Sequence, residues 1–130
     1  MKTTIILAFT VLVLSAVLYA QTAERMRPGQ WSTSTIVGGK TYAAYQCISK
    51  PDADEINGDV KQVEAYLRKV IPPEACNISD VKVSGPQVIY TASCGGQPPK
   101  VVTTAYHGDN FKGTDSAGGK TTGKLMGACK

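Results

Sequence analysis

Four cysteines constrain the fold of this 130-residue chain more than any other feature. Two of them, Cys76 and Cys94, lie equally far from Gly85, and β-branched and aromatic residues fill both arms of that stretch. In an exported chain this short, four cysteines indicate an oxidising compartment and two disulfides, for which three pairings are open. A zinc site does not fit, because no two cysteines lie within two to four residues and His107 is the only histidine.

The first twenty residues predict export. They begin with Lys2, continue as a long apolar run and end at Ala20, which is typical of a secretory signal peptide. We therefore expect residues 1–20 to be a signal peptide and residues 21–130 to form one domain, with no membrane span after cleavage. Removing Lys2 leaves 13 basic against 10 acidic residues, a net charge of about +3. These charges are interspersed along the chain, which argues against nucleic-acid binding.

Short runs rich in Thr, Val, Tyr and Ile, separated by glycine turns, predict antiparallel hairpins. "QWSTSTIVGGKTYAAYQC" predicts a hairpin around Gly38-Gly39 in which Val37 pairs with Lys40. Two later segments bend at Gly108 and Gly118. Together these runs predict six or seven strands.

One segment has helical periodicity instead. Between residues 59 and 71, apolar residues fall on one helical face: Val60, Val63, Leu67, Val70 and Ile71. Asp59 and Gln62 can form a capping box, and Pro72 ends the helix. The carboxylates just upstream, Asp52 among them, lack calcium-loop spacing and are expected in a solvated approach to this helix. The fold class is therefore α+β, with one helix inserted after the second strand.

The hairpin around Gly85 leaves two registers open. A turn through Gly85 sets Cys76 opposite Cys94, so that a disulfide closes the open end of the hairpin. A register shifted by one pairs Val83 with Val88, a better apolar match, and a bulge near the cysteines would reconcile the two. Elimination then pairs Cys47 with Cys129, which brings the N-terminal hairpin against the last strand. That bridge favours a curved, barrel-like sheet.

Several motifs together resemble a known family. "RPGQW" follows the signal sequence, a cysteine ends the second strand, and "GACK" ends the chain. In this order they resemble the DUF3617 family, small exported proteins of Gram-negative bacteria that are uncharacterized. The residues that carry the resemblance are Pro28, Gly29, Trp31, Gly127 and Cys129. The resemblance implies a periplasmic or secreted location and a four-cysteine architecture, and it implies no activity.

No catalytic, metal or cofactor site is expected from the sequence. His107 sits at a predicted turn with only Asp109 and Asp115 as nearby carboxylates, and a solvated turn residue is the simpler interpretation. All four cysteines are expected to be oxidised, and no nucleophile-elbow, zinc-protease or phosphate-loop pattern occurs. We therefore expect a protein that is not an enzyme.

Aromatic residues are the remaining candidates for a site. Seven that fall on different elements are candidates to line a pocket inside the curved sheet, with core packing as the favoured alternative. The five leading candidates are Trp31, Tyr42, Tyr90, Tyr106 and Phe111, and the other two are Tyr45 and Tyr66. The expected function is a non-catalytic binding or accessory protein of the bacterial envelope, recognising a small apolar ligand or an envelope protein. The alternative is a protein–protein interaction module or inhibitor that presents the rigid loop from Gly95 to Pro99.

Overall fold

The computed structural model describes residues 24–130, so the expected signal peptide at residues 1–20 lies outside the described residues. Seven strands and two helices follow one another along the chain. They are β1 (Gly29–Val37), β2 (Lys40–Ile48), α1 (Lys50–Ile56), α2 (Val60–Val70), β3 (Cys76–Ser84), β4 (Gln87–Cys94), β5 (Lys100–Tyr106), β6 (Asn110–Asp115) and β7 (Lys120–Gly127). Within this part of the chain, neither helix is long and apolar enough to span a membrane.

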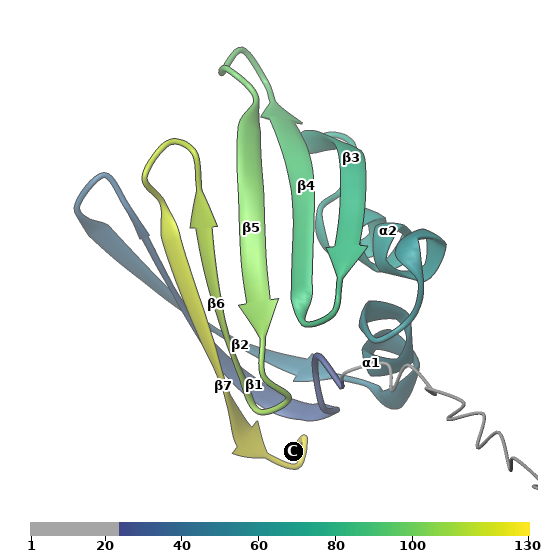
Figure 1. Cartoon of the computed structure of the whole chain (residues 1–130). Coiled ribbons are helices and arrows are strands. Elements are labelled where there is room, and N and C mark those ends of the chain that lie inside the picture. The colour runs from purple at the N-terminus through teal and green to yellow at the C-terminus, as the bar shows by residue number, and fades with distance from the viewer. Residues whose placement is uncertain (1–23) are drawn as a thin grey trace, which may run out of the picture.

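All seven strands form one antiparallel sheet in the order β2-β1-β7-β6-β5-β4-β3. The first hairpin therefore joins the last strand, as expected, and both helices lie on one side of the curved sheet (Figure 1). We call the side that packs against the helices the inner face, and the opposite side the outer face. The α+β class and the curved antiparallel sheet are confirmed. The sheet does not close into a barrel, a point that the sequence left open, because β2 and β3 remain as its two edges.

The hairpin turns follow directly from their glycines. Gly38 and Gly39 both have positive φ, 57° and 77°, which a two-residue hairpin turn matched to the strand twist requires. This turn pairs Val37 with Lys40 and Thr35 with Tyr42, the predicted register. Each strand of the hairpin then runs for nine residues.

The sequence predicted one helix after the second strand, and the structure has two. Helix α2 begins with the predicted capping box, in which the Gln62 backbone N–H donates to Asp59 Oδ1 at 2.9 Å and the Asp59 N–H donates to Gln62 Oε1 at 3.0 Å. Helix α1 was expected to be a solvated approach. It is only seven residues long, is capped by Ser49 and has Pro51 in its first turn, where proline's missing N–H costs nothing.

The β3–β4 hairpin contains both registers that the sequence left open. Cys76 pairs with Cys94, whereas Val83 pairs with Val88 in the register shifted by one. The shift falls between Ser79 and Lys82, and Asp80 there has a φ of 53°, the one positive value among the described non-glycine residues. A bulge therefore lets the disulfide end and the apolar end of the hairpin each keep its own pairing.

Both expected disulfides are present: Cys76–Cys94, 18 residues apart, and Cys47–Cys129, 82 residues apart. Loop-closure arithmetic gives roughly 3 kcal/mol for the shorter bridge and roughly 4.5 kcal/mol for the longer. The longer bridge joins β2 to the segment after β7, and both of these strands pair with β1. It therefore ties neighbouring strands together and does not pull the β2 edge toward the β3 edge, which explains the open sheet.

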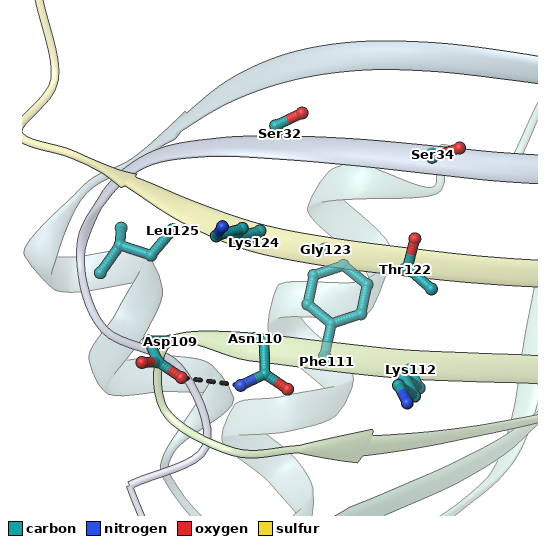
Figure 2. Close-up of a pocket in the computed structure, with 10 residues that line it drawn as sticks. All are labelled: Ser32, Ser34, Asp109, Asn110, Phe111, Lys112, Thr122, Gly123, Lys124 and Leu125. Carbon is teal, nitrogen blue, oxygen red and sulfur yellow. Dashed lines mark hydrogen bonds between the residues drawn. The ribbon is translucent and has the colours of Figure 1, made fainter.

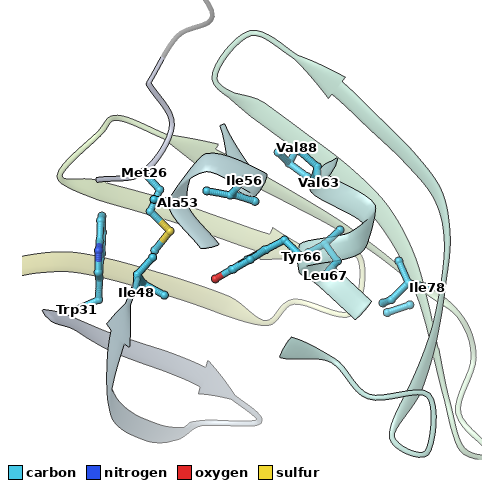
Figure 3. Packing of buried hydrophobic residues seen from close by; sticks show 11 residues of the cluster. Met26, Trp31, Ile48, Ala53, Ile56, Val63, Tyr66, Leu67, Ile78 and Val88 are labelled. Atoms are coloured by element: carbon cyan, nitrogen blue, oxygen red, sulfur yellow. The ribbon is translucent and has the colours of Figure 1, made fainter. Parts of the chain in front are cut away.

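The hydrophobic core fills the space between the inner face and the two helices (Figure 3). Its completely buried large side chains come from five different elements. They are Trp31, Ile48, Ile56, Val63 and Val88. Because α2 supplies Val63 and the sheet supplies Trp31 and Val88, the helices enclose the apolar side chains of a sheet that does not close on itself.

Arg25 fixes the start of the domain to both helices and to the sheet. Its side chain is buried and donates to the backbone oxygens of Gly85, Ile56 and Gly58 at 2.7 to 3.0 Å. Burial lowers the pKa of this guanidinium from its usual value. Asn57 holds the same segment, since its side-chain oxygen accepts from the backbone N–H groups of Arg25 and Met26.

Candidate functional site

The five family-motif residues meet at one corner of the fold, where each has a structural role. A Cβ on Gly29 would lie 2.5 Å from the Gly127 backbone oxygen, so only glycine allows β1 and the end of β7 to approach this closely. The Trp31 indole is completely buried and donates to the Arg27 backbone oxygen at 2.9 Å. Pro28 precedes this corner and Cys129 closes it through its disulfide. The motif residues therefore hold the start of β1 against the end of β7 and the segment that follows it.

Four of the five candidate pocket aromatics lie near one another. The Trp31 ring stacks on Phe111 with centroids 5.7 Å apart, and Tyr106 tilts against Phe111 at 5.5 Å. Tyr90, Tyr106 and Phe111 line one cavity, and Trp31 supports it from behind Phe111. Tyr42 does not join them, because it lies on the edge strand β2 and is 59 % exposed.

The cavity, which we name the tyrosine pocket, has a volume of about 190 Å³ and lies between α2 and the inner face. Its lining is mostly aromatic and aliphatic, with a smaller share of hydroxyl groups. The main lining residues are Tyr66, Leu67, Val70, Tyr90, Val102, Thr104, Tyr106, Phe111, Gly113 and Thr121. A site of this kind, apolar with a few polar groups, is the usual form of a small-molecule pocket.

Three phenol groups give the tyrosine pocket its polar character. Among residues 24–130, the hydroxyls of Tyr66, Tyr90 and Tyr106 make no hydrogen bond to a protein group. If these oxygens were fully buried they would be buried atoms without a partner, but in the described chain the one such side-chain oxygen belongs to Glu55. Each phenol oxygen therefore keeps accessible surface in the pocket. Because these three hydroxyls are accessible in one cavity and make no hydrogen bond to the protein, they leave hydrogen-bonding capacity for a ligand or water.

Burial keeps these phenols protonated. It raises the pKa of Tyr66 to about 12, and the Asp52 carboxylate adds to the rise. Burial also raises the pKa of Tyr106, with contributions from its neighbours Tyr66 and Tyr90, and it raises the pKa of Tyr90 with a contribution from Asp115. At neutral pH the three groups are hydrogen-bond donors and acceptors, and none is a base.

One glycine lines the tyrosine pocket, and another makes room for one of its rings. Gly113 pairs with Thr104, and a Cβ there would meet the threonine hydroxyl oxygen at 3.1 Å. Gly123 lies beneath Phe111, where a Cβ would overlap the ring. These glycines let the aromatic rings lie flat on the sheet, so the pocket is walled by rings rather than filled by them.

Two titratable residues, Asp115 and His107, make hydrogen bonds within hairpin turns. Asp115 lines the pocket, yet its Oδ1 accepts from the backbone N–H groups of Ala117 and Gly119 in the β6–β7 turn. His107 is exposed in the β5–β6 turn, where its backbone N–H donates to the Asn110 oxygen. The arrangement can bind and orient a small molecule, and it brings together no nucleophile and base.

A second hollow, of about 480 Å³, lies on the outer face over β1, β7 and β6 (Figure 2). Most residues that line it are polar or basic: Ser32, Ser34, Asn110, Lys112, Thr122 and Lys124. They alternate along the strands with Phe111, Gly123 and Leu125, which complete the lining. Asp109 lies at one end, where it accepts from Asn110 Nδ2 at 2.7 Å. The two hollows thus lie on opposite faces of the same strands.

Tyr66 is the pocket residue that the sequence reasoning left out of its five leading candidates, although it counted Tyr66 among the aromatic residues that could line a pocket. It is 7 % exposed and lies on the buried side of α2 with Val63 and Leu67. The signal was present, since Val63, Tyr66, Leu67 and Val70 follow the helical spacing of three, four and seven residues. Counting only aliphatic residues in that stripe hid the aromatic member that faces the sheet.

Comparison with known proteins gives one match. The model of the family described as "Protein of unknown function (DUF3617)" matches residues 26–129. No curated protein matches the chain, and no solved structure matches it.

Proposed function

Since the chain belongs to the DUF3617 family, which supplies no activity, we propose its function from the geometry: a non-catalytic protein that binds a small apolar ligand in the tyrosine pocket. The observation that carries the proposal is the group of three phenol hydroxyls that line one cavity and make no hydrogen bond to a protein group. Apolar walls favour an apolar ligand, and the phenols recognise one or two oxygen atoms on it.

The size and charge of the tyrosine pocket narrow the ligand class. Its volume of about 190 Å³ suits a molecule near the size of a substituted aromatic ring, since an engineered cavity of about 150 Å³ holds benzene. Asp115 at its wall, and Asp52 near Tyr66, disfavour a ligand with negative charge. The best fit is a neutral molecule with a ring or short apolar chain and a carbonyl, ether or hydroxyl oxygen.

The proposed location is the periplasm of a Gram-negative bacterium. Two disulfides with no free cysteine in the described chain support an oxidising compartment. The apolar start of the sequence, which has the pattern of a signal peptide, supports export. The protein would there act as a binding or accessory component of the envelope.

The test uses Trp31, the single tryptophan, as a reporter, because it stacks on the Phe111 ring that lines the tyrosine pocket. Oxidised protein expressed from the full chain is titrated with acetophenone, a neutral aromatic ketone, while the tryptophan emission is followed. Saturable binding is expected, and Tyr106→Phe should weaken it about twofold to tenfold by removing one hydrogen bond. Tyr45→Phe is the matched control, because Tyr45 is 75 % exposed on β2. No saturable change, or equal weakening in both variants, contradicts the proposal.

A second candidate function is protein recognition by the loop from Gly95 to Pro99, which is fully exposed between β4 and β5. The loop begins at the disulfide-bonded Cys94, whose backbone oxygen accepts from the Gln97 N–H at 3.0 Å. A photo-crosslinker placed at Gln97 should capture a discrete envelope protein, whereas one placed at the exposed Gln87 should not. Identical capture from both positions would exclude a role specific to this loop.

A further inference from the structure

Lysines that are separated from one another in the sequence lie close together on the outer face. Lys112 on β6 and Lys120 and Lys124 on β7 are all exposed on this face, and we name them the lysine face. The cross-strand register places Lys112 beside Thr122, between the other two lysines. Lys120 and Lys124 are four residues apart, a spacing of about 13 Å along the strand.

The charge of the lysine face is not neutralised by neighbouring acids. No ion pair in the described chain involves any of its three lysines, since the pairs lie on the helices or join Arg27 to Glu24. Helices α1 and α2, with the residue that caps α2, hold half of the chain's acidic residues: Asp52, Asp54, Glu55, Asp59 and Glu64. The one acid beside the hollow, Asp109, is at its end and bonded to Asn110. The acids of the helix layer are nearly balanced by its own basic residues, Lys50, Lys61, Arg68 and Lys69, whereas the lysine face keeps an excess of positive charge.

Hydrogen-bonding groups fill the space between the lysines. Ser32 pairs across the ladder with Lys124, and Ser34 pairs with Thr122. Asn110 pairs with Lys124 from the other side. Ammonium groups alternate here with hydroxyl and amide groups, so the hollow of about 480 Å³ offers both charge and neutral polar contacts.

We propose that the lysine face binds a linear anionic polysaccharide, because cations recognise the acidic groups and the Ser, Thr and Asn side chains recognise the sugar hydroxyls. A lipid bilayer fits less well, because hydroxyl and amide side chains stand between the lysines, and the exposed apolar side chain nearest to them, Ile36, lies at the margin beside Lys120. At one end of the lysine face, Tyr45 is 75 % exposed and provides a ring surface for a sugar. The site is independent of the tyrosine pocket, since it lies on the opposite face.

The test compares two variants of equal net charge. Oxidised full-chain protein is titrated with polygalacturonate and, separately, with neutral dextran and with phosphatidylglycerol vesicles. Lys112→Gln with Lys124→Gln removes two charges from the lysine face. Lys61→Gln with Lys100→Gln removes two charges from α2 and from the far end of β5, at lysines that form no ion pair in the described chain.

Wild-type protein should bind polygalacturonate, and the affinity should fall about tenfold in the lysine-face variant and less than twofold in the control, with the difference shrinking as salt rises. Dextran should not bind. Equal losses in both variants would mean a general charge effect and would overturn the proposal. Tighter binding to the vesicles than to polygalacturonate would overturn it in favour of a membrane surface.

Discussion

The two faces of the sheet are made from alternate residues of the same strands, yet they have opposite chemistry. On β6, Phe111 and Gly113 face the helices, whereas Lys112 faces outward. On β7, Gly123 lies under the Phe111 ring while its neighbours Thr122 and Lys124 line the outer hollow. A period of two is therefore enough to separate an aromatic pocket from a cationic surface by the thickness of one sheet.

The difference teaches that burial decides which face is sensitive to substitution. The part of the inner face that carries the core is covered by α1 and α2, so a change there alters packing and the desolvation of polar groups. The outer face is solvated, so a change there alters charge and hydrogen bonding with little effect on folding. Neighbouring residues on one strand provide matched tests of this contrast.

The largest contrast is expected between Trp31 and Ser32. Trp31→Ala should lower the free energy of unfolding by about 3 to 5 kcal/mol, because it empties a completely buried site and removes the partner of Phe111. Ser32→Ala, one residue along on the outer face, should change it by less than about 0.5 kcal/mol. Denaturant unfolding of the oxidised protein measures both. Comparable losses in the two variants would mean that the faces are not energetically distinct.

The second-largest effect is expected from alkaline pH, which should lower the free energy of unfolding through Tyr66 on the inner side of the fold. The folded-state pKa of Tyr66, about 12, exceeds its ordinary value of 10.0, so its protonated form contributes stability that is complete below pH 10 and is lost as the pH rises toward 12. At about 1.4 kcal/mol per pKa unit, the loss is about 2 to 3 kcal/mol. Tyr66→Phe should flatten this part of the pH profile, whereas Tyr45→Phe should not. A profile unaffected by Tyr66→Phe would contradict the assigned burial of this phenol.

A smaller contrast is expected between Gly123 and Thr122. Gly123→Ala places a methyl group where the Phe111 ring lies and should cost about 1 to 3 kcal/mol of unfolding free energy as the ring shifts. It should also weaken acetophenone binding, because Phe111 lines the tyrosine pocket. Thr122→Ala on the outer face should leave both quantities nearly unchanged. Thermal unfolding and the Trp31 titration measure the two effects, and an unchanged pocket in Gly123→Ala would show that the ring does not depend on this glycine.

Much of the fold could be predicted because its determinants are local. Paired glycines define the first hairpin, the capping box at Asp59 defines the start of α2, and the distance of Cys76 and Cys94 from Gly85 indicates their disulfide. The compromise between two registers of β3 and β4 was also visible, since each alternative satisfied one end of the hairpin. The bulge at Asp80 satisfies both.

What the sequence did not determine depends on contacts between distant segments. Helix α1 has only seven residues, too few for a helical period to be recognised in the sequence. Pro51 in its first turn is also typical of a loop. The disulfide between Cys47 and Cys129 suggested a sheet that curls toward a barrel but did not decide whether it closes. It joins β2 to the segment after β7, and β2 and β7 both flank β1. The tyrosine pocket required knowing that α2 lies over β4 to β6. That packing brings Tyr66 to Tyr90 and Tyr106 and leaves Tyr42 at the edge.

The most direct test of the central claim is native mass spectrometry of the oxidised protein, purified gently from the periplasm of an expressing bacterium. We expect a stoichiometric adduct of small mass on the wild-type chain, which disappears in the variant that combines Tyr66→Phe, Tyr90→Phe and Tyr106→Phe and persists in the Tyr42→Phe control. The protein should be lighter than its reduced form by four hydrogens, one pair for each disulfide. A bare wild-type chain, or an adduct that survives the triple substitution, would contradict a ligand site in the tyrosine pocket.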